Sequence, residues 1–209
     1  NKYGYVVDGL QLFLDGEDNE GTGIHNSSAT LWKDLSGNEY NGTLKNMDTG
    51  SCWEEKGLKF DGIDDFVTIA EMNYENPTLE TVVSIPSDVN EYMSIISNVE
   101  AGGYELSLQT NNKFRFSVYI VKYSISGSYD KNKVKIRASN GVTMQGINMS
   151  GNIKIPDNNT FLSLGCNPGM DTIGSLLNGT IYSVRIYDKA LSDEEMAVNF
   201  LNDIEKYNL

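Results

Sequence analysis

The chain is poor in the residues that most metal and redox sites need. Its 209 residues include two cysteines, Cys52 and Cys166, and one histidine, His25. Two cysteines are too few for a disulfide framework and their spacing matches no metal motif. They would be able to pair in an exported protein, but we expect free thiols, with Cys166 as a small core residue. A single histidine excludes a zinc site built from several histidines, and His25 lies in a polar loop without an evident catalytic partner.

Basic residues and long apolar runs are also scarce. The sequence has 16 Lys and Arg against 29 Asp and Glu, which gives a net charge of −13. Phosphate backbones are bound by basic faces, so this charge argues against a nucleic acid or an anionic membrane surface as partner. No apolar run approaches the roughly 20 residues that span a membrane, so we expect no membrane insertion. Neutral ligands such as glycans remain open, and so do divalent cations.

Proline is rare and glycine is abundant, with four and 20 residues respectively. This balance favours many tight turns between unbroken strands. Alternating apolar segments recur between turn dipeptides such as "DG" and "NG", which is typical of antiparallel strands. The clearest segments are 10–15, 57–60, 66–70, 78–85, 93–98, 104–109, 113–121, 133–139, 160–165 and 179–188. Their spacing predicts one all-β domain, an antiparallel sandwich or jelly roll.

A helix is predicted at the C-terminal end, in "LSDEEMAVNFLNDIEKY" (191–207). Ser192 and Glu195 have the spacing of a capping box. Apolar residues recur on one side and predict a stripe that docks on the sheet; they are Met196, Ala197, Phe200, Leu201 and Ile204. We assign residues 10–209 to a single domain and residues 1–9 to an entering strand or a linker remnant.

Four segments in order carry a family resemblance. They are "GLQLFLDGEDNEGTG" (9–23), "TLWKDLSGNEYNGTL" (30–44), "LKFDGIDDFVTI" (58–69) and "LNGTIYSVRIYDKALSDEEM" (177–196). The chain resembles the laminin-G-like branch of the concanavalin A-like lectin/glucanase superfamily. This resemblance implies a jelly roll of two curved antiparallel sheets with one C-terminal amphipathic helix. It also implies a non-catalytic module of the kind found in bacterial surface proteins, secreted multi-domain enzymes and phage tails.

The acidic stretch "FDGIDDF" (60–66) separates two predicted strands. Asp61 and Gly62 are typical of a hairpin turn whose aspartate binds its own backbone. The adjacent Asp64 and Asp65 repel each other and are less easily explained by a turn. Ca²⁺ binds six to eight oxygens and often mixes carboxylates with loop carbonyls. We therefore expect a turn first and, as the alternative, one structural calcium ion held by Asp61, Asp64 and Asp188, with Asp15 as a weaker companion.

A ligand-binding face is predicted in the segment 113–123. Alternation places Arg115 and Tyr119 on one face of a strand, which we expect to be the exposed concave face, and Tyr123 follows closely. Trp32 and Trp53 are instead expected to pack in the core or at its edge.

The E-x-D-x-x-E pattern of the superfamily's glucanases is absent from the sequence. So are the G-x-S-x-G nucleophile elbow and the P-loop, and no catalytic residues are assigned. We expect a non-catalytic extracellular module, cell-surface-attached or virion-associated, that binds a glycan or a cell-surface component. The alternative is a structural or protein-interaction module without a sugar site, which contacts neighbouring domains of a larger protein. A glycoside hydrolase is the second alternative and requires two facing carboxylates in a groove.

Overall fold

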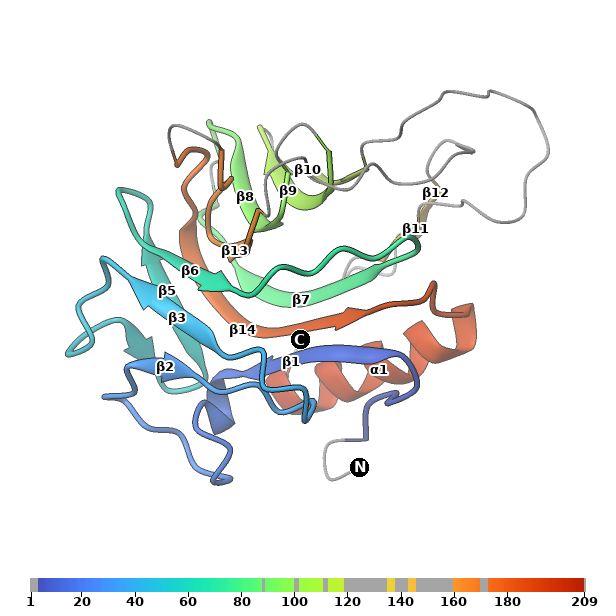
Figure 1. Cartoon of the computed structure of the whole chain (residues 1–209), viewed down its shortest axis with the longest axis horizontal. Helices are drawn as coiled ribbons and strands as arrows, with labels where there is room; N and C mark the ends of the chain where they lie inside the picture. Colours follow the sequence, from blue (N-terminus) through green and yellow to red (C-terminus); the bar gives the residue numbers. More distant parts are fainter. Residues whose placement is uncertain are drawn as a thin grey trace.

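The computed structural model describes residues 4–87, 89–99, 102–110, 113–118, 135–137, 143–145, 160–169 and 173–208. In these residues two antiparallel sheets pack face to face, and α1 (Asp193–Tyr207) lies against the smaller sheet (Figure 1). The predicted all-β sandwich of two antiparallel sheets with a C-terminal helix is therefore confirmed. A separate two-stranded ribbon joins β11 (Lys135–Arg137) to β12 (Thr143–Gln145).

The larger sheet has seven strands. In spatial order they are β10 (Lys113–Val118), β9 (Tyr104–Gln109), β8 (Met93–Ser97), β13 (Leu162–Leu164), β6 (Phe66–Ile69), β3 (Gly42–Lys45) and β2 (Leu31–Trp32). Successive side chains of a strand point to opposite faces. On β9, Leu106 and Leu108 join the core, so Glu105 and Ser107 lie on the outer face of this sheet.

The smaller sheet is organised around one long strand. Its members are β1 (Leu10–Asp15), β14 (Asn178–Tyr187), β5 (Gly57–Asp61), β4 (Trp53–Glu54) and β7 (Thr78–Ser84). Along one edge β14 pairs with β7 over almost its whole length. Along its other edge β14 pairs first with β5 and then with β1. This central strand therefore fixes the distance between the acidic turn after β5 and the start of β1.

The core lies between the two sheets and contains both tryptophans. Trp32 is fully buried and Trp53 nearly so. Their rings meet edge to face, with centroids 5.4 Å apart at 85°, and the Trp53 Nε1–H donates to the carbonyl of Ala29 at 2.8 Å. The packing role predicted for both is confirmed. Cys52 and Cys166 are buried free thiols, and burial raises the pKa of Cys166 to about 11.

Helix α1 begins with the predicted capping box. The Ser192 Oγ accepts from the Glu195 N–H at 3.1 Å, and Glu195 Oε2 accepts from the Ser192 N–H at 2.8 Å. These bonds satisfy two backbone donors that the first helical turn leaves unpaired. Among the described residues no helix has the length and apolar character needed to cross a membrane.

The buried face of α1 agrees only in part with the predicted apolar stripe. Met196, Ala197, Phe200 and Ile204 are half-buried, whereas Leu201 is 64% exposed. The buried residues of the helix are the polar Asn199 and Asp203. The cause lies in β14, where Arg185 on the outer face of the smaller sheet is 1% exposed. A buried guanidinium must be paired and hydrogen-bonded, so the helix turns polar residues toward the sheet.

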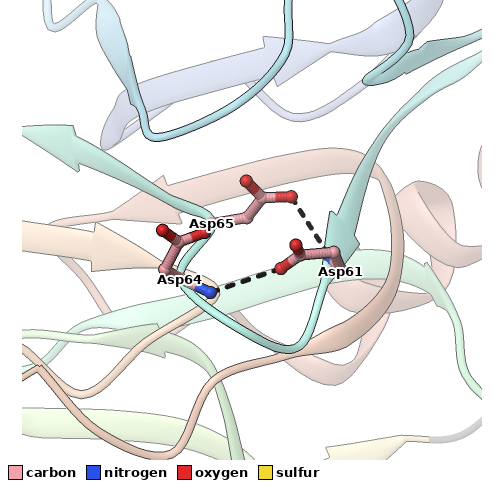
Figure 2. Close-up of side chains that lie close together, drawn as sticks. All are labelled: Asp61, Asp64 and Asp65. Carbon is pink, nitrogen blue, oxygen red and sulfur yellow. Dashed lines mark hydrogen bonds between the residues drawn. The ribbon is translucent and has the colours of Figure 1, made fainter.

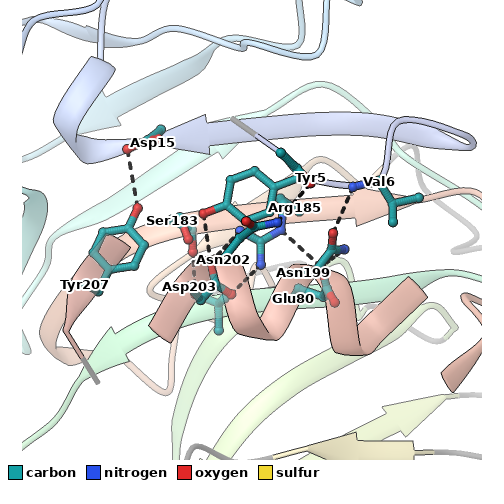
Figure 3. Close-up of polar contacts among 12 residues, drawn as sticks. Tyr5, Val6, Asp15, Glu80, Ser183, Arg185, Asn199, Asn202, Asp203 and Tyr207 are labelled. Carbon is teal, nitrogen blue, oxygen red and sulfur yellow. Dashed lines mark hydrogen bonds and ion pairs between the residues drawn. The ribbon is translucent and has the colours of Figure 1, made fainter. Parts of the chain in front are cut away.

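Figure 3 shows the resulting buried network. Arg185 Nη1 and Nη2 donate to the two carboxylate oxygens of Asp203 at 2.9 and 2.6 Å, and Arg185 Nε donates to Glu80 at 3.0 Å. Asn199 Nδ2 also donates to Glu80, at 2.8 Å. Burial raises the pKa of Glu80, against the lowering effect of Arg185. One cation thus faces two carboxylates in this interior.

Residues 4–8, which we call the N-terminal strap, cover the same network. The Tyr5 hydroxyl donates to Asp203 at 2.9 Å, and the Val6 N–H donates to Asn199 Oδ1 at 2.9 Å (Figure 3). The Arg185 guanidinium carbon lies 4.1 Å from the centroid of the Tyr5 ring. The strap is therefore packed against the domain, although the boundary predicted at residue 9 stays a prediction.

Candidate functional site

The acidic stretch forms a tight turn between β5 and β6 (Figure 2). Asp61 Oδ1 accepts from the backbone N–H groups of Ile63 and Asp64 at 2.7 and 3.3 Å. Gly62 has φ +78°, a conformation that favours glycine. A Cβ there would also approach the Cβ of Asn178 to 2.9 Å, so the lack of space requires glycine as well. The predicted turn is confirmed.

Three carboxylates meet at this turn. Each of Asp61, Asp64 and Asp65 contributes an oxygen, and these oxygens all lie within 4.8 Å of one another. Asp61 and Asp64 are exposed, whereas Asp65 is buried. Burial raises the pKa of Asp65, the hydrogen bond from the Asp61 N–H lowers it, and the neighbouring charges of Asp61 and Asp64 raise it again. This donor set suits a hard divalent cation, and calcium binding here stays a prediction.

The structure does not bring the expected third residue, Asp188, to this turn. Asp61 pairs with Asn178 at the start of β14, whereas Asp188 follows the last residue of that ten-residue strand. At about 3.3 Å per residue the two aspartates are roughly 30 Å apart. Asp188 instead accepts from Gln11 Nε2 at 2.9 Å. The grouping of Asp188 with Asp61 and Asp64 is corrected, and Asp65 is the third carboxylate of the cluster.

Asp15, the weaker companion, is also placed elsewhere. It is fully buried at the end of β1 and forms an ion pair with Lys206 of α1. Its Oδ1 accepts from the Glu17 N–H at 3.0 Å. Asp15 therefore joins β1 to the end of the helix.

Of the predicted ligand-binding residues, the structure describes Arg115 alone. Tyr119 and Tyr123 lie outside the described residues. Arg115 is exposed on β10 and stands opposite Ser107 of β9. Because Ser107 is on the outer face of the seven-stranded sheet, Arg115 lies on that face too. Arg115 is exposed, as the alternation indicated; its place on a concave face and its role in binding stay predictions.

Beside Arg115 the outer face carries a polar cluster that the sequence reasoning missed. Glu105 is 3% exposed, and its two carboxylate oxygens accept hydrogen bonds from the hydroxyls of Tyr92 and Ser94. Ser94 stands opposite Ser107 in the register of β8 and β9. Burial and the hydrogen bond to Glu105 raise the pKa of Tyr92 to about 12, so its hydroxyl stays protonated at neutral pH. We call Tyr92, Ser94, Glu105, Ser107 and Arg115 the outer-face cluster.

Tyr92 was missed because it precedes β8 and belongs to no alternating pattern. Glu105 was missed because it lies in "YELSLQ", where it reads as the solvated side of a strand. Only the register between β8, β9 and β10 places these residues next to Arg115. Glutamate at an alternate strand position was the one available signal, and it does not distinguish a buried carboxylate from an exposed one.

Comparisons with known proteins concern the fold alone. No family model matches the chain, and no curated protein sequence matches it. The Trypanosoma rangeli sialidase in complex with sialic acid aligns with a TM-score of 0.60 and 16% identity, over 95% of this chain and 33% of its own. A mutant of that sialidase displaying trans-sialidase activity aligns with a TM-score of 0.57 and 19% identity, over 93% of this chain and 33% of the sialidase.

A third structure, the HCR/D F1240A mutant, covers 95% of this chain and 53% of its own at 15% identity, but its TM-score of 0.49 carries no argument. The chain spans about a third of the length of the sialidases that it matches. The laminin-G-like resemblance therefore stays a prediction. What the comparisons establish is that this β-sandwich is similar in fold to part of a sialidase.

Proposed function

We propose that the chain is a non-catalytic, extracellular glycan-binding module, borne on a cell surface or a virion, and that its site lies around Arg115 on the outer face of the seven-stranded sheet. The observation that carries the proposal is the outer-face cluster itself. An exposed guanidinium stands beside a half-buried tyrosine whose hydroxyl is fixed by a buried carboxylate. Exposed hydrogen-bond donors beside an aromatic ring are what a sugar, polar at its edges and apolar on its faces, requires.

The similarity in fold is compatible with a sugar ligand, and it identifies no binding residue in this chain. The sialidase structure is described in complex with sialic acid, so that protein takes a sugar ligand. At 16% identity and a third of its length, neither its activity nor its site transfers to this chain. The proposal therefore rests on the chemistry of the outer-face cluster.

Two alternatives are weaker on the described residues. A glycoside hydrolase needs a pair of accessible carboxylates, whereas Glu105 is 3% exposed and both its oxygens accept hydrogen bonds from Tyr92 and Ser94. A tyrosine nucleophile would need a lowered pKa, and that of Tyr92 is raised. A protein-interaction module is favoured by a contiguous apolar surface, whereas the outer-face cluster is polar.

The test is a glycan-array screen of the purified chain, followed by titration of each hit. We expect reproducible binding that Arg115→Ala weakens at least tenfold at unchanged melting temperature, because a hydrogen bond to a charged group contributes about 1.5–3 kcal/mol. Lys59→Ala is the matched control, since Lys59 is an exposed cation on β5 of the other sheet. A blank array, or a hit indifferent to Arg115, would contradict the proposal and direct the search to a protein partner.

A further inference from the structure

A lysine and two acidic side chains meet where β1 lies against the end of α1. Lys206 is in the last turn of the helix, and its Nζ contacts Oδ2 of Asp15, the last residue of β1. The same Nζ lies 3.4 Å from Oε2 of Glu17. Asp15 is fully buried, whereas Lys206 and Glu17 are half-buried. An amine, a carboxyl group and a second carboxylate therefore share one largely enclosed space.

The two carboxylate oxygens of Asp15 have different surroundings. Oδ1 accepts from the Glu17 N–H at 3.0 Å and from the Tyr207 hydroxyl at 3.4 Å (Figure 3), whereas Oδ2 faces Lys206. Burial and the charge of Asp15 raise the pKa of Tyr207, so its hydroxyl keeps the proton that it donates. Donors of this kind stabilise the negative charge that develops on one oxygen when a nucleophile attacks the carboxyl carbon.

Glu17 is placed to carry protons between the other two groups. Its Oε1 pairs with Lys56 at 2.7 Å, while Oε2 faces Lys206. Burial raises the pKa of Glu17, but the hydrogen bond from Lys56 and the charges of both lysines lower it, and the net effect is a lowered pKa. Glu17 is therefore a carboxylate at neutral pH, and a carboxylate beside an ammonium group can act as a general base.

We propose that Lys206 and Asp15 join in an intramolecular isopeptide bond, with Glu17 as the catalytic residue. Glu17 takes a proton from Lys206 Nζ and passes it to Asp15 Oδ2. The neutral amine attacks Cγ of Asp15, the C–N bond forms, and negative charge rests on Oδ1. Glu17 then moves a second proton from the nitrogen to Oδ2, the C–Oδ2 bond breaks, and water leaves. An ammonium and a carboxylate give an amide and water, so the step needs no other reactant.

Two physical effects favour this bond over an ion pair. The fold holds the amine against the carboxyl group, which makes the step intramolecular. The amide is neutral, whereas a buried ion pair carries the desolvation cost of two charges. The bond closes a covalent ring from residue 15 to residue 206, and such a ring restricts the unfolded chain as a disulfide does. Because Cys52 and Cys166 are free thiols, this link does not depend on cysteine oxidation.

The test is the intact mass of the purified chain, measured by mass spectrometry under denaturing conditions. We expect a mass below that of the sequence by one water molecule, about 18 Da. A succinimide at an Asp-Gly pair such as Asp15–Gly16 loses the same mass. Proteolysis must therefore also yield a branched peptide, in which the segment that contains Asp15 is joined to the segment that contains Lys206.

Three variants test the roles of the groups. Lys206→Arg keeps the positive charge but removes the amine, so it should have the full mass of its sequence. Glu17→Gln keeps the backbone N–H that binds Asp15 and removes the proton carrier, so it should also have the full mass. Tyr207→Phe removes one donor to Oδ1 and should leave a larger unreacted fraction in freshly expressed protein. Circular dichroism shows that each variant remains folded.

Lys189→Arg is the matched control. Lys189 also pairs with two carboxylates, those of Asp8 and Glu195, but the side chain of Asp8 is 82% exposed. This variant should lose one water molecule as wild type does. A folded wild-type chain of full sequence mass would show an ion pair only and overturn the proposal, and so would a loss of water that persists in Lys206→Arg. A cross-link that forms equally in Glu17→Gln would overturn the role of Glu17.

Discussion

Asp65 has the least favourable position among the three carboxylates of the acidic turn. It is buried, and both neighbouring carboxylates are close enough to raise its pKa. An acid whose pKa is raised by folding contributes stability at low pH and loses it as the pH rises through the raised pKa. At neutral pH, without a cation, the charge of Asp65 therefore opposes folding. A bound divalent cation would reverse this effect.

The variant Asp65→Asn distinguishes a plain turn from a turn that binds calcium. Asparagine keeps an acceptor for the Asp61 N–H and removes the charge. In a chelator at pH 7 we expect the variant to melt at least as high as wild type, and the difference to disappear as the pH approaches 4. With calcium, wild type should gain several degrees and the variant less, by differential scanning calorimetry.

Asp48→Asn is the matched control for this change, because Asp48 is an exposed aspartate whose carboxylate also caps its own turn. It should leave the calcium-dependent gain as in wild type. If Asp65→Asn and Asp61→Ala both keep the calcium-dependent gain in melting temperature of wild type, any calcium ion binds elsewhere than at this turn.

At the scale of elements, a buried ion pair between Arg185 and Asp203 links α1 to β14. Asp203 accepts from both terminal nitrogens of Arg185, whereas an asparagine has one acceptor oxygen and would turn N–H donors toward the guanidinium. Glu80 still balances the charge of Arg185, so the cost is that of a lost hydrogen bond to a charged group, about 1.5–3 kcal/mol. Asp203→Asn should therefore lower the melting temperature by several degrees, since 1 kcal/mol corresponds to about 2–4 °C for a chain of this size. Thermal unfolding followed by circular dichroism measures this.

Glu80→Gln is the informative partner variant. Glutamine can still accept from Arg185 and Asn199, and it removes a buried charge whose pKa is raised. We expect its melting temperature at pH 7 to equal or exceed that of wild type, with the difference lost in acid. Leu201→Ala, at an exposed helix position, should change stability by no more than about 0.5 kcal/mol. A large loss of stability in Leu201→Ala with no loss in Asp203→Asn would show that the apolar stripe, and not the ion pair, attaches the helix.

At the scale of the whole molecule, the N-terminal strap connects the two ends of the described chain. Tyr5 is 4% exposed, its ring meets Phe13 edge to face at 5.3 Å, and its hydroxyl binds Asp203. Deleting residues 1–8 should thus lower the melting temperature by roughly 10 °C, because removal of a buried aromatic side chain costs about 3–5 kcal/mol. Deleting residues 1–3 alone, which keeps Tyr5, is the control. Equal melting temperatures for the two deletions would support a linker remnant.

The sequence by itself determined the features that depend on neighbouring residues. Strand alternation, the Asp61–Gly62 turn and the Ser192–Glu195 capping box all act within a few positions, and each formed as predicted. The burial of Trp32 and Trp53 agrees with the packing role that the family resemblance suggested. These features can be read from the sequence because period and capping chemistry are properties of short segments.

Only the tertiary structure decided which distant residues meet. Asp65 replaced Asp188 at the turn because the length of β14 separates them, and strand length says nothing of what lies at either end. Asp203 turned inward because a residue on another element, Arg185, required a charged partner, and Asn199 turned inward to bind Glu80 and Tyr187. Tyr92 and Glu105 joined Arg115 through strand register alone. Register and docking are set by the free energy of the assembled core, which no short segment contains.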